Sequence, residues 1–583
     1  MKKLLLGNYA VARGAYEAGV RVVSSYPGTP STEITEAMAT FPADEVYVEW
    51  APNEKVACEV AIGASIAGAR AMTCCKHVGL NVMADPIFTA AYTGVNGGLV
   101  VCVADDPGMH SSQNEQDSRH YAEAAKLLML EPSDSEECRD FTAAAFELSE
   151  KFDTPVFIRL STRVSHSQSL VEERERAAVE LKPYEKNIQK YVMMPANAKG
   201  RHVVVEKRQA ELAEYAESCP FNTVEHCADG KIGVITSGTS YLYAKEALGD
   251  GVGYLKLGIA YPMPKQLILD FCAKYEKVYV IEELDPFIET HCRALGITNI
   301  YGKSEFSLIG EYTAALISRV VLGKEAPEHF THTEAIPVRP PVMCAGCPHR
   351  GTFYVLKKLG LTVAGDIGCY TLGAVAPLAS VDTTICMGAS VSAALGMAKA
   401  RGAEFNKKLV SVIGDSTFMH SGITGLVDIV YNKGANTVII LDNSITGMTG
   451  HQENPTTGYT IRGEETRQVN LLALCRSLGI EHVVVADPFD LKEFERVVRE
   501  ETERDEVSVI IAQRPCALLK RFKYTGKCVI NSEKCKKCKL CMKLGCPAIS
   551  VGEDGAVRID ETQCCGCGLC INICPFGAIE KED

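Results

Sequence analysis

The cysteines near the carboxyl end constrain what this chain can fold into more than any other feature. Ten of its 25 cysteines lie between Cys528 and Cys574. The later run, "CCGCGLCINICP", has the spacing C-x2-C-x2-C-x3-C-P, and the earlier run, "CKKCKLCMKLGCP", repeats it with one additional residue before the last cysteine. Such paired runs are typical of small domains that hold two iron–sulfur clusters and obtain most of their folding free energy from them.

The spacing also predicts which cysteines share a cluster. In two-cluster domains the fourth cysteine of each run binds the cluster of the other run. Two [4Fe–4S] clusters are therefore expected, and zinc ions are the alternative for the same cysteines. Cys528 and Cys565 are left over, and we expect them to be bystanders. The predicted ligands are Cys535, Cys538, Cys541 and Cys574 for the first cluster, and Cys564, Cys567, Cys570 and Cys546 for the second.

Length and composition exclude several classes of protein. A chain of 583 residues suggests about three to five domains. The net charge of −13 argues against nucleic acid as a partner, and no apolar run reaches the roughly 18 residues that a membrane span needs. The first residues, "MKKLLLGNYAVARG", lack the apolar stretch of a signal peptide. We therefore expect a cytoplasmic protein, away from membranes, whose cysteines serve metal or redox chemistry rather than disulfides.

Polar residues follow two predicted buried strands in the middle of the chain. The segments "KLVSVIGDS" and "NTVIILDNS" each contain an apolar, β-branched run that stops at an acidic or amide residue. A helical pattern between them ends at Lys433-Gly434 and completes a β-α-β unit. Ligands of such sheets bind at the carboxyl ends of the strands, where carboxylate and amide oxygens suit Mg²⁺. Asp415 and Asn443 are therefore candidate Mg²⁺ ligands.

This paired motif resembles the thiamine diphosphate signature of the 2-oxoacid:ferredoxin oxidoreductases, in the variant that reads GDS and DN. The resemblance implies that Asp415, Asn443 and the backbone carbonyl of Ile445 hold Mg²⁺ on the diphosphate of the cofactor. It also implies that the "CMGAS" segment lies near the diphosphate. The further cofactor-binding residues implied in this way are Gly414, Ser416, Met387, Gly388 and Ala389.

The same family uses an earlier domain to supply a glutamate to the aminopyrimidine ring of the cofactor. The segment "PNEKVACEVAIGASIAGA" offers Glu54 at the start of a helix of small residues, with Glu49 and Glu59 as rivals. The loop "YPGTPS" resembles the Y-P-x-T-P-S loop of the family, which implies that Thr29 binds the carboxylate of the substrate. The segment "DDPGMHSSQNEQDSR" resembles the family as well, but no role is assigned to its residues.

A further cysteine set precedes and follows the predicted Mg²⁺ motif. The loop "CAGCPHR", one cysteine about 25 residues on and one beyond the motif resemble the ligands of a proximal [4Fe–4S] cluster in this family. The alternatives are a small zinc site for the loop, and Cys386 as the fourth ligand. The implied ligands are Cys344, Cys347, Cys369 and Cys516.

The pattern as a whole predicts a multidomain α/β protein with a small α+β domain at its end. Residues 1–195 would form a pyrimidine-binding thiamine diphosphate domain with its connector, and residues 340–525 the diphosphate- and Mg²⁺-binding domain. Residues 228–325 resemble a transketolase C-terminal domain, and residues 526–583 a ferredoxin domain with two [4Fe–4S] clusters. In the transketolase-like part, we expect the three acids Glu282, Glu283 and Asp285 to be a solvated strand end, with a partner-facing edge as the alternative.

This domain order resembles the α subunits of the indolepyruvate:ferredoxin oxidoreductases. The resemblance implies an enzyme that oxidatively decarboxylates arylpyruvates to aryl-acetyl-CoA and CO₂ and reduces ferredoxin. It further implies a small β subunit that is similar to the γ domain of the family, in an α2β2 assembly. The alternatives are the same chemistry on another 2-oxoacid, or a non-catalytic subunit that only transfers electrons through iron–sulfur clusters.

Overall fold

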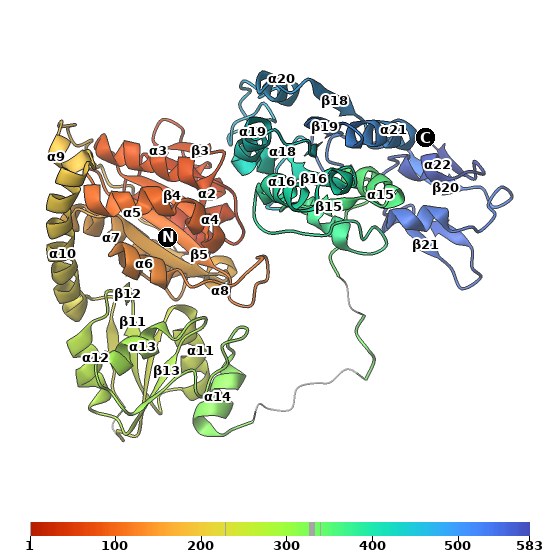
Figure 1. Ribbon diagram of the computed structural model, residues 1–583. Coiled ribbons are helices and arrows are strands. Elements are labelled where there is room, and N and C mark those ends of the chain that lie inside the picture. The colour runs from red at the N-terminus through yellow and green to blue at the C-terminus, as the bar shows by residue number, and fades with distance from the viewer. Residues whose placement is uncertain (1, 228, 326–332, 338–339, 583) are drawn as a thin grey trace. The chain divides into compact units, whose positions relative to one another are not determined.

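The computed structural model describes residues 2–227, 229–325, 333–337 and 340–582. The chain forms two compact units, residues 1–333 and 334–583, which are described separately (Figure 1). The predicted α/β class is confirmed in both. The division into four domains stays a prediction, and the limits placed at residues 1, 228 and 583 lie outside the described residues.

The first unit contains a seven-stranded sheet with the order β12-β6-β7-β5-β4-β2-β3. Six strands are parallel, and β12 pairs antiparallel with β6 at one edge. The central strand β5 is buried along its whole length and apolar up to its last residue, Asp105, as expected for a parallel strand that is covered on both faces. The strands are β2 (Val22–Ser25), β3 (Tyr47–Trp50), β4 (Ala71–Lys76), β5 (Leu99–Asp105), β6 (Leu128–Leu130), β7 (Val156–Ser161) and β12 (Ile259–Tyr261).

A second sheet of the first unit has the order β14-β13-β10-β11-β9. The helix α10 (Pro195–Ser218) joins the two parts of this unit, and its buried Arg208 donates to the carbonyl oxygens of Ala91 and Asp153. Because β12 comes from the later part of the sequence but extends the first sheet, the two parts share backbone pairing. The strands are β9 (Thr223–Glu225), β10 (Ile232–Ser237), β11 (Gly253–Leu257), β13 (Lys277–Ile281) and β14 (Ile300–Tyr301).

The second unit is built on a parallel five-stranded sheet with the order β15-β16-β17-β19-β18. The strands β16 (Leu409–Gly414) and β17 (Thr437–Asp442) are neighbours, and the helix α19 (Ile423–Tyr431) lies between them in the sequence, as predicted for the β-α-β unit. The other elements used below are β15 (Thr362–Ala364), β18 (His482–Ala486), β19 (Ser508–Gln513), α15 (His349–Leu359), α16 (Ala389–Arg401) and α21 (Leu491–Thr502).

The cysteine-rich tail consists of two strand pairs and two short helices, and each pair joins one strand from each half of the repeat. β20 (Lys527–Ile530) pairs with β23 (Ile579–Glu582), and β21 (Ile549–Val551) pairs with β22 (Val557–Ile559). The helices η3 (Leu540–Leu544) and α22 (Leu569–Ile573) follow the first cysteines of each run. No helix in the described part of the chain is long and apolar enough to cross a membrane.

The tail also shares an apolar core with the parallel sheet of the second unit. Leu544, Ile549 and Ile573 belong to the same buried cluster as Phe353 of α15 and Phe494 of α21. Polar contacts reinforce this packing, because Arg350 donates to the carbonyl oxygens of Leu544 and Gly545 at 2.8 and 2.6 Å. The tail therefore does not depend on clusters alone for burial of its side chains.

Candidate functional site

The predicted Mg²⁺ ligands lie at the carboxyl ends of β16 and β17. Asp415 directly follows β16 and Asn443 directly follows β17, and both side chains are buried. The register pairs Gly414 with Leu441, so the two strand ends reach the same edge of the sheet. The sequence pattern and the parallel pairing together explain why these two polar groups meet.

The side chains of Asp415 and Asn443 and the carbonyl oxygen of Ile445 converge at this edge. The amide oxygen of Asn443 lies 3.2 Å from Oδ1 of Asp415 and 2.7 Å from the carbonyl oxygen of Ile445. Turning the amide by 180° would place its NH₂ group on the same two oxygens, which is the arrangement that hydrogen bonding alone favours. Octahedral Mg²⁺ with ligands at about 2.1 Å brings neighbouring oxygens to about 3.0 Å. The three groups therefore fit a small divalent cation.

The surroundings of Asp415 hold its second oxygen in place. Thr456 donates its hydroxyl to Oδ2 at 3.0 Å, which leaves Oδ1 directed at the converging oxygens. Burial, with a smaller contribution from the charge of Asp442, raises the pKa of Asp415 to about 7. A bound cation reverses this effect, because it stabilises the carboxylate directly.

The amino end of α16 lies beside the segment that follows Asp415. The buried carboxylate of Asp366 accepts hydrogen bonds from the backbone N–H groups of Gly388 and Ser390, both at 2.9 Å. Gly388 has a left-handed φ of 88°, and a β-carbon there would lie 2.6 Å from Cβ of Ser421. The helix start, with Met387 and Ala389 on either side of Gly388, is thereby held in place by Asp366, and the N–H of Ala389 donates to the carbonyl oxygen of Cys386 at 3.0 Å.

In the first unit, Glu54 is the buried member of the three candidate glutamates. It begins α3 (Glu54–Ile66), and the preceding Asn53 caps this helix by accepting from the N–H of Val56 at 2.9 Å. The carboxylate lies against Gly79 of α4 (His77–Val82), where a β-carbon would come within 2.5 Å of Oε1. The rivals differ: Glu59 is exposed and bonded to Lys55, and Glu49 accepts from two hydroxyl groups.

Thr29 lies in the loop after β2, next to a lysine that the sequence analysis missed. A β-carbon on Gly28 would lie 3.2 Å from Cγ of Lys76, the last residue of β4. Lys76 donates to the carbonyl oxygen of Ser111 at 2.6 Å, and burial lowers its pKa to about 8 against the charges of Asp106 and Glu54. A lysine that ends an otherwise apolar strand, in "AMTCCK", was the available signal.

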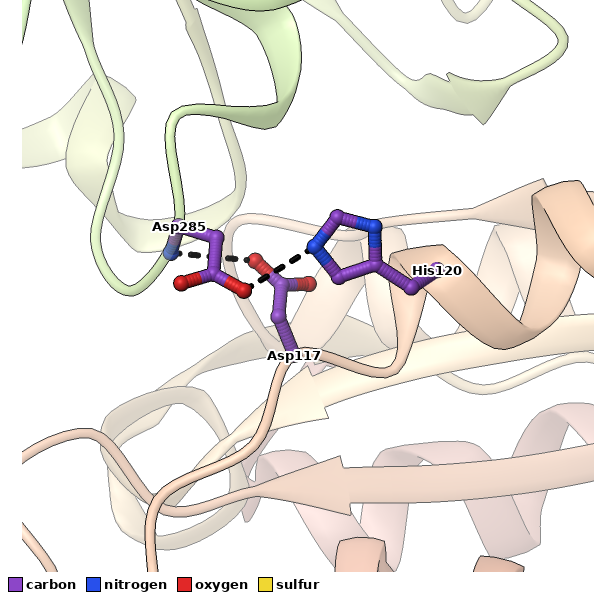
Figure 2. Close-up of side chains that lie close together, drawn as sticks. All are labelled: Asp117, His120 and Asp285. Atoms are coloured by element: carbon purple, nitrogen blue, oxygen red, sulfur yellow. Dashed lines mark hydrogen bonds and ion pairs between the residues drawn. The ribbon is translucent and has the colours of Figure 1, made fainter.

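Figure 2 shows a second polar group of the first unit, in which side chains of Asp117, His120 and Asp285 lie close together. The carboxylate of Asp117 is already paired with the buried Arg119 at 2.5 Å, and the exposed His120 contacts Asp285 at 2.9 Å. Arg119 also donates to Glu282 at 2.6 Å. Because arginine compensates the charge of Asp117, we interpret this group as a polar contact that holds the two parts of the first unit together, and not as a metal site.

The expectation that Glu282 and its neighbours form a solvated strand end is therefore wrong for two of the three acids. Glu282 and Glu283 are 3% and 7% exposed. Glu282 pairs with Arg119 and accepts from the N–H groups of Ile288 and Glu289 at 2.9 and 3.0 Å, at the start of α13 (Phe287–Ala294). The sequence offered no sign of this, because the arginine partner lies about 160 residues earlier.

The proximal cysteines gather beside the Mg²⁺ motif. A β-carbon on Gly447 would lie 3.3 Å from Sγ of Cys369 and 3.8 Å from Nδ2 of Asn443. Cys516 donates its N–H to the carbonyl oxygen of Asn443 at 3.0 Å. Burial, with smaller contributions from the nearby Cys516 and Cys344, raises the pKa of Cys369 to about 11.

Cys347 completes this group, whereas Cys386 is set apart from it. Burial raises the pKa of Cys347 to about 12, and Cys369 and Cys344 contribute to the rise. The rival Cys386 is exposed. Partial burial raises the pKa of its thiol, and the second contribution comes from the charge of Asp366 instead of from another cysteine. The surroundings therefore favour Cys516 over Cys386 as the fourth member.

The tail cysteines line two separate cavities, which we call the inner and the outer cavity. The inner cavity also borders Ala345 and Gly346 of the "CAGC" loop, and Cys528 and Cys565 lie in its wall instead of being remote from it. The inner cavity is lined by Cys546, Cys564, Cys567 and Cys570, and the outer cavity by Cys535, Cys538, Cys541 and Cys574. These are the two sets that the crossed pairing of the repeat predicts.

The spacing of the sulfur atoms distinguishes clusters from single zinc ions. A tetrahedral zinc site with Zn–S bonds of about 2.3 Å holds its sulfurs at about 3.8 Å from one another. Among the described residues, no three cysteines bring their sulfurs within 4.8 Å. Backbone N–H groups of Cys528 and Ala578 also point at the sulfurs of Cys564 and Cys574, both at 3.3 Å. The cavities therefore fit a multinuclear cluster with hydrogen-bonded ligands better than a zinc ion.

Three family profiles match the chain. The profile described as pyruvate flavodoxin/ferredoxin oxidoreductase, thiamine diphosphate-binding, matches residues 13–218. The profile of the C-terminal thiamine pyrophosphate-binding domain of thiamine pyrophosphate enzymes matches residues 366–512, and that of the 4Fe-4S binding domain matches residues 557–580. The chain thus contains thiamine diphosphate-binding domains and an iron–sulfur domain.

Curated relatives match over almost the whole length. Indolepyruvate oxidoreductase subunit IorA of Archaeoglobus fulgidus is 41% identical, over 99% of this chain and 97% of its own. The IorA subunit of Pyrococcus horikoshii is also 41% identical, over 100% of this chain and 97% of its own. A solved 2-oxoglutarate:ferredoxin oxidoreductase from Magnetococcus marinus is 21% identical with a TM-score of 0.47, over 55% of this chain and 65% of its own. The identity over the full length shows that the chain belongs to the IorA family of indolepyruvate oxidoreductase subunits.

Proposed function

We propose that this chain is the catalytic subunit of an oxidoreductase that converts indolepyruvate and other arylpyruvates, with coenzyme A, to aryl-acetyl-CoA and CO₂ and passes the electrons to ferredoxin. One observation supports this above the others. The three oxygens that fit Mg²⁺ lie beside the proximal cysteines, because Asn443 contacts the backbone of Cys516 and lies near Cys369. A cofactor site and an electron acceptor are therefore built from the same loops.

The second unit would bind the cofactor through its diphosphate. Asp415, Asn443 and the carbonyl oxygen of Ile445 would hold Mg²⁺, and Thr456 would keep Asp415 oriented. Gly414 and Ser416 flank Asp415, and Met387, Gly388 and Ala389 at the start of α16 would lie beside the diphosphate. Bound thiamine diphosphate supplies the carbon nucleophile that 2-oxoacid decarboxylation requires.

The first unit would supply the groups that act on the pyrimidine and on the substrate. Glu54 would hold a hydrogen bond to the aminopyrimidine ring, and its burial excludes water that would compete for it. Thr29 would donate its hydroxyl to the carboxylate of the 2-oxoacid. Lys76 adds a positive charge on the same side of the sheet, close to the Thr29 loop.

Electrons would leave through three [4Fe–4S] clusters. Cys344, Cys347, Cys369 and Cys516 would hold the first, the inner cavity the second and the outer cavity the third. A small β subunit would complete an α2β2 enzyme in the cytoplasm. The choice between indolepyruvate, phenylpyruvate and pyruvate is left to substrate profiling.

The test is anaerobic purification of the chain with its β subunit, followed by iron, sulfide and thiamine analysis. At four irons per four-cysteine site, about twelve irons and one thiamine diphosphate are expected for each chain. Reduction of methyl viologen should then require coenzyme A and be fastest with an arylpyruvate. Purified, iron-replete protein that binds no thiamine diphosphate would instead support the non-catalytic electron-transfer subunit.

A further inference from the structure

The two cavities of the tail differ in their surroundings. The inner cavity borders Ala345, Gly346 and Arg350, so it adjoins the loop of the proximal cysteines. The outer cavity is lined only by residues of the tail, and one of its cysteines, Cys538, is exposed. If electrons follow the route of the proposed function, on which this inference rests, they reach the outer cavity last.

Lysines crowd the outer cavity in a chain that is acidic as a whole. The segment 534–546 contains five lysines and no acid, although the net charge of the chain is −13. Lys536 and Lys539 line the cavity together with Phe576, whose side chain is 46% exposed. Lys534 is neutralised by Glu580 at 2.6 Å, whereas Lys536, Lys539 and Lys543 have no ion pair within the described part of the chain.

Two of these lysines occupy backbone positions that disfavour any side chain. Lys537 and Lys539 have φ values of 54° and 59°, in the left-handed region. The other half of the repeat has glycine at the equivalent positions, Gly566 and Gly568, with φ values of 74° and 79°. A residue with a β-carbon destabilises the fold there, and glycine does not. The chain therefore keeps two positive charges where its own repeat shows that glycine suits the backbone.

We propose that this lysine rim, formed by Lys536, Lys537 and Lys539 beside Cys538 and Phe576, is the docking surface for the external electron carrier. The partner that it fits is a small protein with an acidic face around its own redox centre. Unpaired charges at the edge of a contact accelerate association and orient the partner, while the exposed ring of Phe576 supplies apolar area beside them. The exposed Cys538 brings the last cluster close to that surface.

The test uses the complete enzyme and the variant K536Q/K537G/K539G, which removes three charges and gives two positions the residue their backbone favours. The KM for ferredoxin at low ionic strength should rise about tenfold or more, and the rate should depend less steeply on salt. Methyl viologen is a small molecule without an acidic face and does not need the lysine rim for docking. Its rate of reduction should therefore stay the same, and the iron content should be unchanged.

The matched control is K186Q/K199Q/K265Q, which removes the same number of exposed lysine charges from the first unit. The proposal is overturned if the rim variant keeps the parental KM and salt dependence, or if the control variant changes them equally. It is also overturned if the rim retains RNA or anionic vesicles while ferredoxin kinetics are unaffected. Should the parent reduce no viologen with any 2-oxoacid, the proposed function fails instead, and binding of ferredoxin to parent and variant, measured by biolayer interferometry, still decides the docking surface.

Discussion

Replacing Arg119 by methionine should destabilise the first unit strongly. The guanidinium is 1% exposed and bonds Asp117 at 2.5 Å and Glu282 at 2.6 Å, with further bonds to the carbonyl oxygens of Glu283 and Asp285. Removing one partner of a buried ion pair leaves uncompensated charge and typically costs about 3–5 kcal/mol. We therefore expect the free energy of unfolding of this unit to fall by about that amount.

The loss should depend on pH in a defined direction. Burial already raises the pKa of Glu282. Burial acts in the same direction on Asp117, but the charges of Arg119 and Arg159 outweigh it and lower the pKa of Asp117. Without Arg119 the pKa values of Asp117 and Glu282 in the folded state both rise. The variant therefore loses stability only at pH values where these two carboxyl groups are ionised in the unfolded chain, above about pH 4. Each carboxylate then adds at most about 1.4 kcal/mol per pH unit. The gap between parent and variant should be small near pH 4.5 and large at pH 7.5.

The measurement is urea unfolding followed by tryptophan fluorescence. The chain has a single tryptophan, Trp50, which lies in β3 and therefore reports on the first unit. The control is R163M, because Arg163 is 55% exposed and its pair with Glu311 should contribute about 1 kcal/mol at most. A loss for R119M below about 1 kcal/mol, or one that does not shrink on acidification, would refute the assignment of Arg119 as the compensating charge.

Three further outcomes are expected at the site. D415N should reduce thiamine diphosphate binding at least about tenfold while the tail keeps its iron, because a charged Mg²⁺ ligand is lost but the cysteines are untouched; equilibrium dialysis and iron analysis check this. G79A should also weaken thiamine diphosphate binding, because the new β-carbon would lie 2.5 Å from Oε1 of Glu54, and unchanged affinity would argue against Glu54 as the pyrimidine partner. C369S should lower the iron content from about twelve to about eight per chain and remove one set of electron paramagnetic resonance signals, whereas C386S should change neither.

Local pattern in the sequence was enough to predict much of this chain. Strand ends marked by Asp415 and Asn443 could be recognised because parallel strands deliver their last residues to one edge. The crossed assignment of cysteines followed from the symmetry of the repeat, and the two cavities enclose the same two sets. These inferences need only spacing and periodicity, which are properties of short segments.

Contacts between distant segments decided the rest. The orientation of the Asn443 amide toward Ile445, the half-buried Lys76 and the pairing of Arg119 with Glu282 all depend on which loops pack together. The same is true of the difference between the inner and the outer cavity, because only packing against the "CAGC" loop separates them. The amino-acid order states where a strand stops or a cysteine repeats, but burial and charge compensation arise only when side chains far apart in the chain exclude water from one another.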